Sequence, residues 1–216
     1  MKIFTDELYN IVARDNLAKL QEAKETGINI YEVDQYRRSL LDIAVLNSAF
    51  QVTEYLIKQG LTVNTNSDFQ SLPLHTACTV SNIKMVKLLL KYGADIHLKD
   101  NKGNTVLHYA VEGLGRTGWQ IELIKYFVEE LKFFIDIPNF EGNTPLFLSN
   151  SKLIPYLIEK GANIKLTNKQ GDTPWLYLAK NYFDHFDFRK ELQKKVEYLL
   201  EYGSDINSQD GKNQTA

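Results

Sequence analysis

The sequence predicts an all-α protein assembled from repeated helix–turn–helix segments. Three observations carry this prediction. A short motif centred on glycine recurs along the chain, a second motif follows it at a constant distance, and the apolar residues between the motifs have helical spacing. A repeat period of roughly 20–50 residues is typical of an array of stacked units.

The first motif is written TGINI, QGLTVN, YGADIH, KGANIK and YGSDIN. A glycine that follows an apolar run ending in Lys or Tyr predicts a left-handed residue at a helix C-terminus. In LKFFIDI we expect Lys132 to take the place of this glycine, so that the successive intervals are 33, 33, 39, 29 and 42 residues. The positions are Gly27, Gly60, Gly93, Lys132, Gly161 and Gly203.

The second motif begins twelve residues after each of these positions and reads SLLDIA, LPLHTA, TVLHYA, TPLFLS, TPWLYL and a terminal TA. Pro73 and Pro145 stand where a first helical turn is expected, and proline is tolerated there because that turn needs no N–H donor. The two motifs keep their distance through insertions and a deletion, which chance similarity does not explain. The motif starts are Ser39, Leu72, Thr105, Thr144, Thr173 and Thr215.

Each repeat carries two short helical patterns. In the third repeat they are LPLHTACTV and IKMVKLLLKYG, and the second has apolar residues at helical spacing, at Ile83, Val86, Leu89 and Leu90. A connector rich in Gly, Asn and Asp, such as DNKGN, then predicts a turn before the next pair of helices.

These motifs resemble the ankyrin repeat family. The resemblance is carried by LPLHTA with LLLKYGADI, by NTVLHYA, by GNTPL with LIEKGANI, and by GDTP with LLEYGSDIN, and it covers nearly the whole chain. It implies an all-α ankyrin-repeat solenoid, in which two antiparallel helices are followed by a hairpin-like loop projecting at right angles. One such repeat cannot bury its apolar face alone, so neighbouring repeats are expected to stack.

We expect a single domain over residues 1–216 with six repeats. The fourth repeat carries six extra residues, which we place at GLGRTG (113–118); the fifth is four residues short, which predicts a stunted first helix; the sixth gains nine. The expected boundaries are 5–33 (an N-terminal cap), 34–66, 67–99, 100–138, 139–167 and 168–209, with 210–216 as the start of a truncated seventh repeat.

Composition narrows the function classes. The 216 residues are 44% hydrophobic and 24% charged, as in globular proteins, and a net charge of −2 leaves no basic footprint for nucleic acid. No apolar run is long enough to span a membrane, and the N-terminus MKIFTDELYN lacks the apolar region of a signal peptide. We expect a cytoplasmic protein, or one delivered into a host cell by a signal that cannot be read here.

The sequence offers no convincing catalytic or metal-binding set, and we expect no cofactor. His75 and His108 occupy the T-P-L-H position, where the family resemblance implies hydrogen bonds within and between repeat loops. Cys78 lies three residues after His75, but it replaces a small residue packed between helices, so we expect a buried, unreactive thiol.

The expected function is protein binding. In the family resemblance, partners meet the concave side formed by the loop tips and the exposed faces of the first helices. Aromatic residues at loop tips have no reason to be there for core packing, and aromatic and Arg side chains dominate binding hot spots. The candidate partner-binding residues are Tyr36, Arg38, Phe69, Lys102, Tyr109, Arg116, Phe140 and Tyr177.

The partner is expected to be a protein of unknown identity, bound by a chain that is monomeric or self-associates through its C-terminal end. An adaptor, a microbial effector and a toxin-neutralising immunity protein would all use the same surface. The insertions at 113–120 and 181–190 either bind or only pack.

A rival hypothesis starts from GLGRTG, which matches the G-x-G-x-x-G pattern of dinucleotide-binding loops. That pattern requires a preceding strand and a following helix. The repeat register instead places TVLHYAV on a first helix and Asp136 in a connector. We therefore expect an enlarged turn between two helices, with Arg116 at its apex as a contact residue.

Titration of the protein with NAD(P) or ATP distinguishes these hypotheses. We expect no saturable binding at millimolar ligand, because helices rather than a strand and helix flank the glycines. Saturable binding that disappears in Gly115→Ala would instead support a nucleotide-dependent enzyme.

Overall fold

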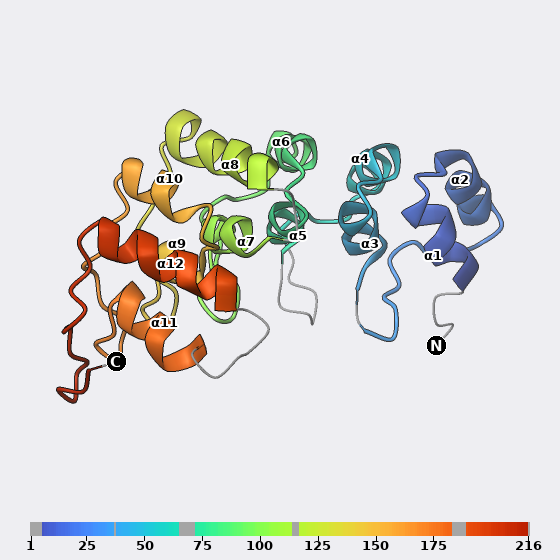
Figure 1. The fold of residues 1–216 in the computed structure, drawn as a ribbon. Helices are drawn as coiled ribbons and strands as arrows, with labels where there is room; N and C mark the ends of the chain where they lie inside the picture. Colours follow the sequence, from blue (N-terminus) through green and yellow to red (C-terminus); the bar gives the residue numbers. More distant parts are fainter. Residues whose placement is uncertain (1–5, 37, 65–71, 114–116, 183–188, 216) are drawn as a thin grey trace. The chain divides into compact units, whose positions relative to one another are not determined.

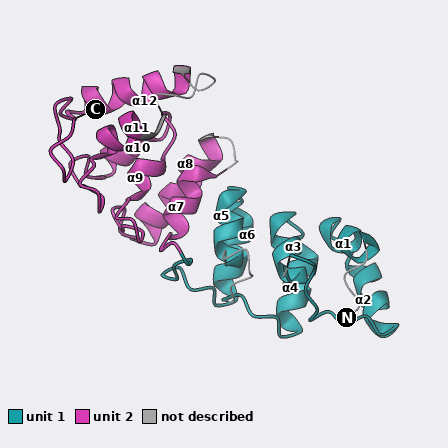
Figure 2. Ribbon diagram, turned by 90° about the horizontal axis from the view of Figure 1, so that it is seen from below, with its two compact units in different colours: residues 1–101 teal, residues 102–216 magenta. Residues whose placement is uncertain are grey.

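The computed structural model describes residues 6–36, 38–64, 72–113, 117–182 and 189–215. These residues form twelve α-helices and one π-helical turn, with no strand beyond an isolated bridge between Val33 and Ser39 (Figure 1). The expected all-α fold is therefore confirmed. The chain divides into two compact units, an N-terminal unit (residues 1–101) and a C-terminal unit (residues 102–216), shown in Figure 2.

The N-terminal unit contains three helix pairs. Within each pair the two helices pack on each other, and the first helices of successive pairs also pack in series, α1 on α3 and α3 on α5. Their shared interior is apolar and includes Leu20, Leu41 and Met85, each at most 1% exposed. The pairs are α1 (Asp6–Ala13) with α2 (Leu17–Glu25), α3 (Leu40–Leu46) with α4 (Phe50–Lys58), and α5 (Pro73–Thr79) with α6 (Ile83–Lys91).

The C-terminal unit repeats this arrangement with less regular helices. α9 packs between α7 and α11, and α12 packs on both α10 and α11. α9 has only four residues, which confirms the stunted first helix expected from the short fifth repeat. The helices are α7 (Val106–Glu112), α8 (Thr117–Lys125), the π-turn η1 (Tyr126–Glu130), α9 (Pro145–Leu148), α10 (Ile154–Glu159), α11 (Pro174–Tyr182) and α12 (Arg189–Glu201). In the described ranges, none of the helices has the length and apolar content that crossing a membrane requires.

The helix starts follow local sequence. Pro73 and Pro145 lie at the first turns of α5 and α9, as predicted. Ser39 and Asp42 cap α3 reciprocally, because each side chain accepts the backbone N–H of the other residue. The carboxylate of Asp15 accepts the backbone N–H of Val52 at 2.8 Å and so ties the first helix pair to the start of α4.

The fourth repeat departs from the others at the end of its second helix. In the repeats with glycine, the amide after the glycine bonds the carbonyl five residues back, as Ala94 does with Leu89. In the fourth repeat, Phe133 bonds Phe127, six residues back. The π-turn η1 therefore holds one additional residue. We expected all six extra residues of this repeat at GLGRTG. That expectation was wrong for one of them, because the π-turn at the end of the second helix contains it.

Lys132 adopts the left-handed conformation expected of it, with φ of 56°. The equivalent glycines have φ of 84° to 97°. A side chain other than glycine costs roughly 1–2 kcal/mol in this region because its Cβ crowds the backbone.

Lys132→Gly should therefore stabilise the protein. The relief of backbone crowding is offset by the larger entropy that glycine has in the unfolded chain, about 0.5–1 kcal/mol. We expect a net gain of about 0.5–1 kcal/mol in the free energy of unfolding, measured by urea denaturation with circular dichroism.

The matched control is the reverse change at the equivalent position, Gly161→Lys. A Cβ at Gly161 would meet no atom within 4 Å, so only backbone conformation is altered. This variant should lose about as much stability as Lys132→Gly gains. A loss of stability in Lys132→Gly would contradict the conclusion that the left-handed backbone at Lys132 is destabilising.

Candidate functional site: loop tips and first-helix faces

Four loops share one hydrogen-bonding pattern, and three of them precede first helices. In each, a single Asp or Asn side chain accepts the backbone N–H groups two and four residues ahead, at 2.7–3.0 Å. The same residue donates its own N–H to the carbonyl four residues ahead at 2.9–3.0 Å. These bonds close each loop into a compact turn. The organising residues are Asp34, Asn139, Asn168 and Asp210.

In the C-terminal unit, backbone hydrogen bonds join successive loop tips. The loop tips are residues 102–103, 140–142, 169–171 and 211–213. Each of the last three donates to the tip before it, through Phe140 N–H to Lys102, Lys169 N–H to Glu141, and Gly211 N–H to Gln170, at 2.8–2.9 Å. Side-chain amides add a second link between neighbouring loops, since the Asn168 amide donates to the Oδ1 of Asn143 at 3.1 Å.

Two glycines make this close approach possible. A Cβ on Gly103 would lie 2.6 Å from the backbone nitrogen of Phe140, and one on Gly142 would lie 2.8 Å from that of Lys169. Both glycines also have positive φ, 78° and 85°. Each therefore meets a steric and a conformational requirement that other residues do not.

The row of loop tips displays the predicted residues Lys102 and Phe140. Lys102 is exposed. The Phe140 ring lies against Gly103, yet 56% of the residue remains exposed. Phe140 thus packs on its neighbouring loop and is also accessible to a partner.

A groove of about 920 Å³ lies behind these tips. The predicted residue Tyr177, on α11, faces it and is held edge-on against the buried ring of Phe147, with ring centroids 5.7 Å apart. The groove is lined by Glu141, Asn168, Lys169, Gln170, Asp172, Tyr177, Lys180, Asp210, Gly211, Lys212, Gln214 and Thr215.

Within this lining, one lysine and two aspartates form an ion-paired cluster. Lys180 Nζ donates to Asp172 at 2.6 Å and to Asp210 at 2.5 Å, and both aspartates are buried. These hydrogen bonds raise the pKa of Lys180. In return the Lys180 hydrogen bond, aided by the amides of Gln214 and Lys212, lowers the pKa of Asp210 from 3.8 to about 2. Through these two ion pairs, the cluster links the loop before α11 to the last loop, residues 210–214.

The N-terminal unit brings together the predicted residues Tyr36 and Arg38. Asp34 holds both the backbone of this loop and the guanidinium group, whose Nε lies 2.7 Å from Oδ2. The guanidinium carbon lies 5.2 Å from the ring centroid of Tyr36 and 5.9 Å from that of Tyr9. Tyr36 is 52% exposed, so this cation–π group faces solvent.

The other predicted binding residues are less informative. Tyr109, on α7, is half-buried. Phe69, Arg116 and most of the insertion at 181–190 lie outside the described residues.

The histidines and the cysteine have structural surroundings. His108 bonds Thr105 through Nδ1 and the carbonyl of Asn143 through Nε2 at 2.9 Å, and His75 Nε2 lies 3.3 Å from the carbonyl of Leu98. Cys78 is fully buried, and burial raises the pKa of its thiol. Within the described ranges, His, Cys, Asp and Glu side chains form no group of three or more that could hold a metal ion. Residues 106–112 before the glycines of GLGRTG are helical, and Asp136 lies in a connector, where it accepts the N–H of Asn163.

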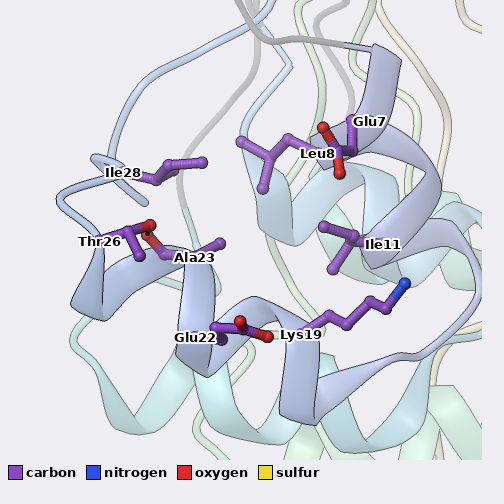
Figure 3. Close-up of a pocket in the computed structure, with 8 residues that line it drawn as sticks. All are labelled: Glu7, Leu8, Ile11, Lys19, Glu22, Ala23, Thr26 and Ile28. Carbon is purple, nitrogen blue, oxygen red and sulfur yellow. Dashed lines mark hydrogen bonds between the residues drawn. The ribbon is translucent and has the colours of Figure 1, made fainter.

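A smaller depression of about 410 Å³ lies on the first helix pair (Figure 3). Leu8 and Ile11 from α1 face Ala23 of α2 and Ile28, with Glu7, Lys19, Glu22 and Thr26 around them. Its lining thus combines apolar side chains with two glutamates, a lysine and a threonine.

Sequence reasoning missed Lys180, Asp172, Asp210 and Tyr9. Asp172 and Asp210 each lie beside a glycine in the loop sequences, Gly171 and Gly211. A signal was present, since Leu176 replaces the T-P-L-H histidine in the sixth repeat and Lys180 lies one helical turn further on. Tyr9 gave no signal, because its proximity to Arg38 arises from packing between repeats.

Comparison with known proteins identifies the repeats. A family model described as ankyrin repeats (3 copies) matches residues 41–130, which span α3 to η1. The chain contains ankyrin repeats. The ankyrin-repeat chain is 28% identical over 209 residues to a putative palmitoyltransferase ZDHHC13 from Danio rerio, a match that covers 93% of this chain and 30% of the relative. The chain thus spans less than a third of the length of this and other palmitoyltransferase relatives.

Solved ankyrin-repeat structures extend the likeness over the whole chain. The ankyrin repeat domain of human ASB11 matches with a TM-score of 0.71 at 21% identity, covering 98% of this chain and 90% of that one. A chain in the structure of the Bd0816 predatory endopeptidase from Bdellovibrio bacteriovorus in complex with immunity protein Bd3460 matches with a TM-score of 0.64 at 22% identity, covering 91% and 98%. At these identities the ankyrin-repeat chain shares the fold alone.

The Lys180 cluster predicts an acid-dependent loss of stability. Asp210 has a lower pKa in the folded than in the unfolded chain. The stability that its charged form contributes is therefore present above pH 3.8 and is lost as the pH falls towards about 2. In Lys180→Met, the free energy of unfolding should fall at neutral pH and should depend less on pH in this window than it does in the wild type. Urea denaturation at a series of pH values measures both effects.

Lys194→Met serves as the control, because Lys194 is exposed on α12 of the same unit. If Lys180→Met and the wild type have the same pH dependence below pH 4, the assigned coupling is wrong.

Proposed function

We propose that this chain is a non-catalytic protein-binding module that contacts its partner through loop tips and first-helix faces. The main support is the exposure of Phe140. This residue is 56% exposed, and it lies at the tip of a loop that is hydrogen-bonded within itself and to both neighbouring loops. The Asn139 side chain closes this loop, and its backbone bonds both the preceding and the following tip.

Rigidity makes such an aromatic suitable for binding. A side chain that is already fixed loses little conformational entropy when a partner covers it. Tyr177 is fixed by Phe147, and Tyr36 by the Asp34–Arg38 ion pair. Hot-spot residues at protein interfaces are commonly Tyr, Trp and Arg, and each contributes about 2 kcal/mol or more when buried at the centre of a contact.

The chemistry of the described residues also supports a binding role. Lys180, Asp172 and Asp210 satisfy one another, the T-P-L-H histidines bond loop groups, and the Cys78 thiol is sealed in the core. Each of these groups is thus engaged in a contact within the fold.

Adaptors, effectors acting on host proteins and toxin-neutralising proteins can all use this kind of surface. One structure of the same fold comes from a complex of an endopeptidase with an immunity protein, but that likeness is one of fold at 22% identity. The palmitoyltransferase relatives are more than three times as long as the matched region. The proposal therefore stops at protein binding.

Combined Phe140→Ala and Tyr177→Ala should weaken partner binding at least tenfold, roughly the effect of losing 1.4 kcal/mol or more. Proteins retained from source-cell lysate by the wild type are identified by mass spectrometry, and the affinity of each variant for the retained protein is then measured. Helicity and melting should change little, since both residues are partly exposed.

Phe134→Ala is the matched control, because Phe134 is an even more exposed phenylalanine in the same unit, at 65%, but lies in a connector. Equal losses in Phe134→Ala and in the double variant would show that general hydrophobicity, not the loop-tip surface, holds the partner.

A further inference from the structure

We infer that the partner segment held by the C-terminal unit is acidic, with an apolar side chain among its carboxylates. The inference rests on the proposed function, and it adds the chemical class of the partner. It is drawn from the charges displayed along the loop tips, the way in which nearby carboxylates are satisfied, and the position of Phe140 among them.

Three of the four loop tips present an exposed lysine. Lys102, Lys169 and Lys212 come from the first, third and fourth tips of the row. Backbone hydrogen bonds join these tips in series, so their lysines lie along one edge of the unit. In the part of the chain that the structure describes, neither Lys169 nor Lys212 forms an ion pair. Both ammonium groups are therefore available to carboxylates of a partner.

The acidic residues around the groove offset most, but not all, of this positive charge. With Lys180, the three tip lysines make four positive charges against the three carboxylates of Asp172, Asp210 and Glu141, which leaves one net positive charge. Asp172 and Asp210 are buried, and both are hydrogen-bonded to Lys180. The Oδ1 atom of Asp210 also accepts the N–H groups of Lys212 and Gln214 at 2.7 and 2.8 Å. Glu141 is the exposed acid of the row, and its carboxylate accepts a hydrogen bond from Asn143 of its own loop at 3.2 Å.

An apolar contact lies within the same row. Phe140 is adjacent to Lys102 through the backbone bond between their tips, and Tyr177 lines the groove together with Lys169 and Lys212. A segment that places carboxylates on the lysines would therefore bring its intervening side chain onto an aromatic ring. Charge complementarity of this kind acts mainly on the association rate and on the choice of partner.

A protein segment fits this surface better than a nucleic acid does. Binding to a phosphate backbone depends on a continuous track of cations that releases counterions. Here Glu141 and Phe140 interrupt the lysines, and the whole chain has a net charge of −2. A segment in which single carboxylates alternate with apolar side chains matches this alternation of lysines with other residues.

Fluorescence anisotropy with synthetic peptides tests the inference. The probe is a short labelled peptide with one Phe between glutamates, and the comparison peptide has glutamine in place of each glutamate. We expect the glutamate peptide to bind at least tenfold more tightly at low salt, and the difference to shrink in about 1 M salt, where charges are screened beyond roughly 3 Å.

Charge reversal locates the effect. Combined Lys169→Glu and Lys212→Glu should abolish the preference for the glutamate peptide. Combined Lys190→Glu and Lys194→Glu changes the net charge equally, on exposed lysines of α12 outside the groove lining, and should preserve it. Unchanged circular dichroism melting checks that both variants fold.

Several results would overturn the inference. These are failure of the glutamate peptide to bind, equal binding of the two peptides, an equal effect of both double reversals, and displacement of the bound peptide by a DNA oligonucleotide at lower concentration than by unlabelled peptide. If Phe140→Ala with Tyr177→Ala still weakens capture of the lysate partner in any of these cases, the proposed function stands and only the acidic class is wrong. If capture is also unaffected, both proposals fail.

Discussion

The row of loop tips in the C-terminal unit depends on one interaction, the backbone N–H that each of the last three tips donates to the tip before it. It requires two backbones to approach within hydrogen-bonding distance, which a Cβ at Gly103 or Gly142 would prevent. It also requires each loop to have the same closed shape, and this comes from one Asp or Asn side chain that accepts two amides of its own loop. The repetition of this bond links each of these loops to the loop before it.

The repeats that deviate from the common pattern keep this register by different chemistry. In the fourth repeat, the His108 imidazole bonds the carbonyl of Asn143 in the next loop. In the sixth repeat, Leu176 stands at the histidine position, and Lys180 links Asp172 to Asp210 of the following loop instead. Ion pairs of Lys180 therefore join two successive loops in the sixth repeat, where the fourth repeat uses the hydrogen bond from His108.

The proposed binding surface and the contacts that stabilise the repeats belong to the same loops. Their inner atoms are used in turns and in contacts between repeats, so their outer side chains are held in place without having to pack in the core. This division explains why Phe140 and Tyr36 are exposed at positions where an aromatic has no core to enter. It also explains why the lysines of three loop tips line up along one edge.

The repeat register, the all-α fold, the left-handed Lys132 and the buried Cys78 all followed from the sequence, because each depends on residues close in the chain or on an apolar period. The same register showed that GLGRTG lacks the strand that a nucleotide loop needs. Only the tertiary structure revealed the π-turn that absorbs an inserted residue, since either a loop or a helix can accept one. It alone brought Arg38 against Tyr9 and Lys180 against Asp210, because these contacts join separate repeats and follow from stacking geometry rather than from local sequence.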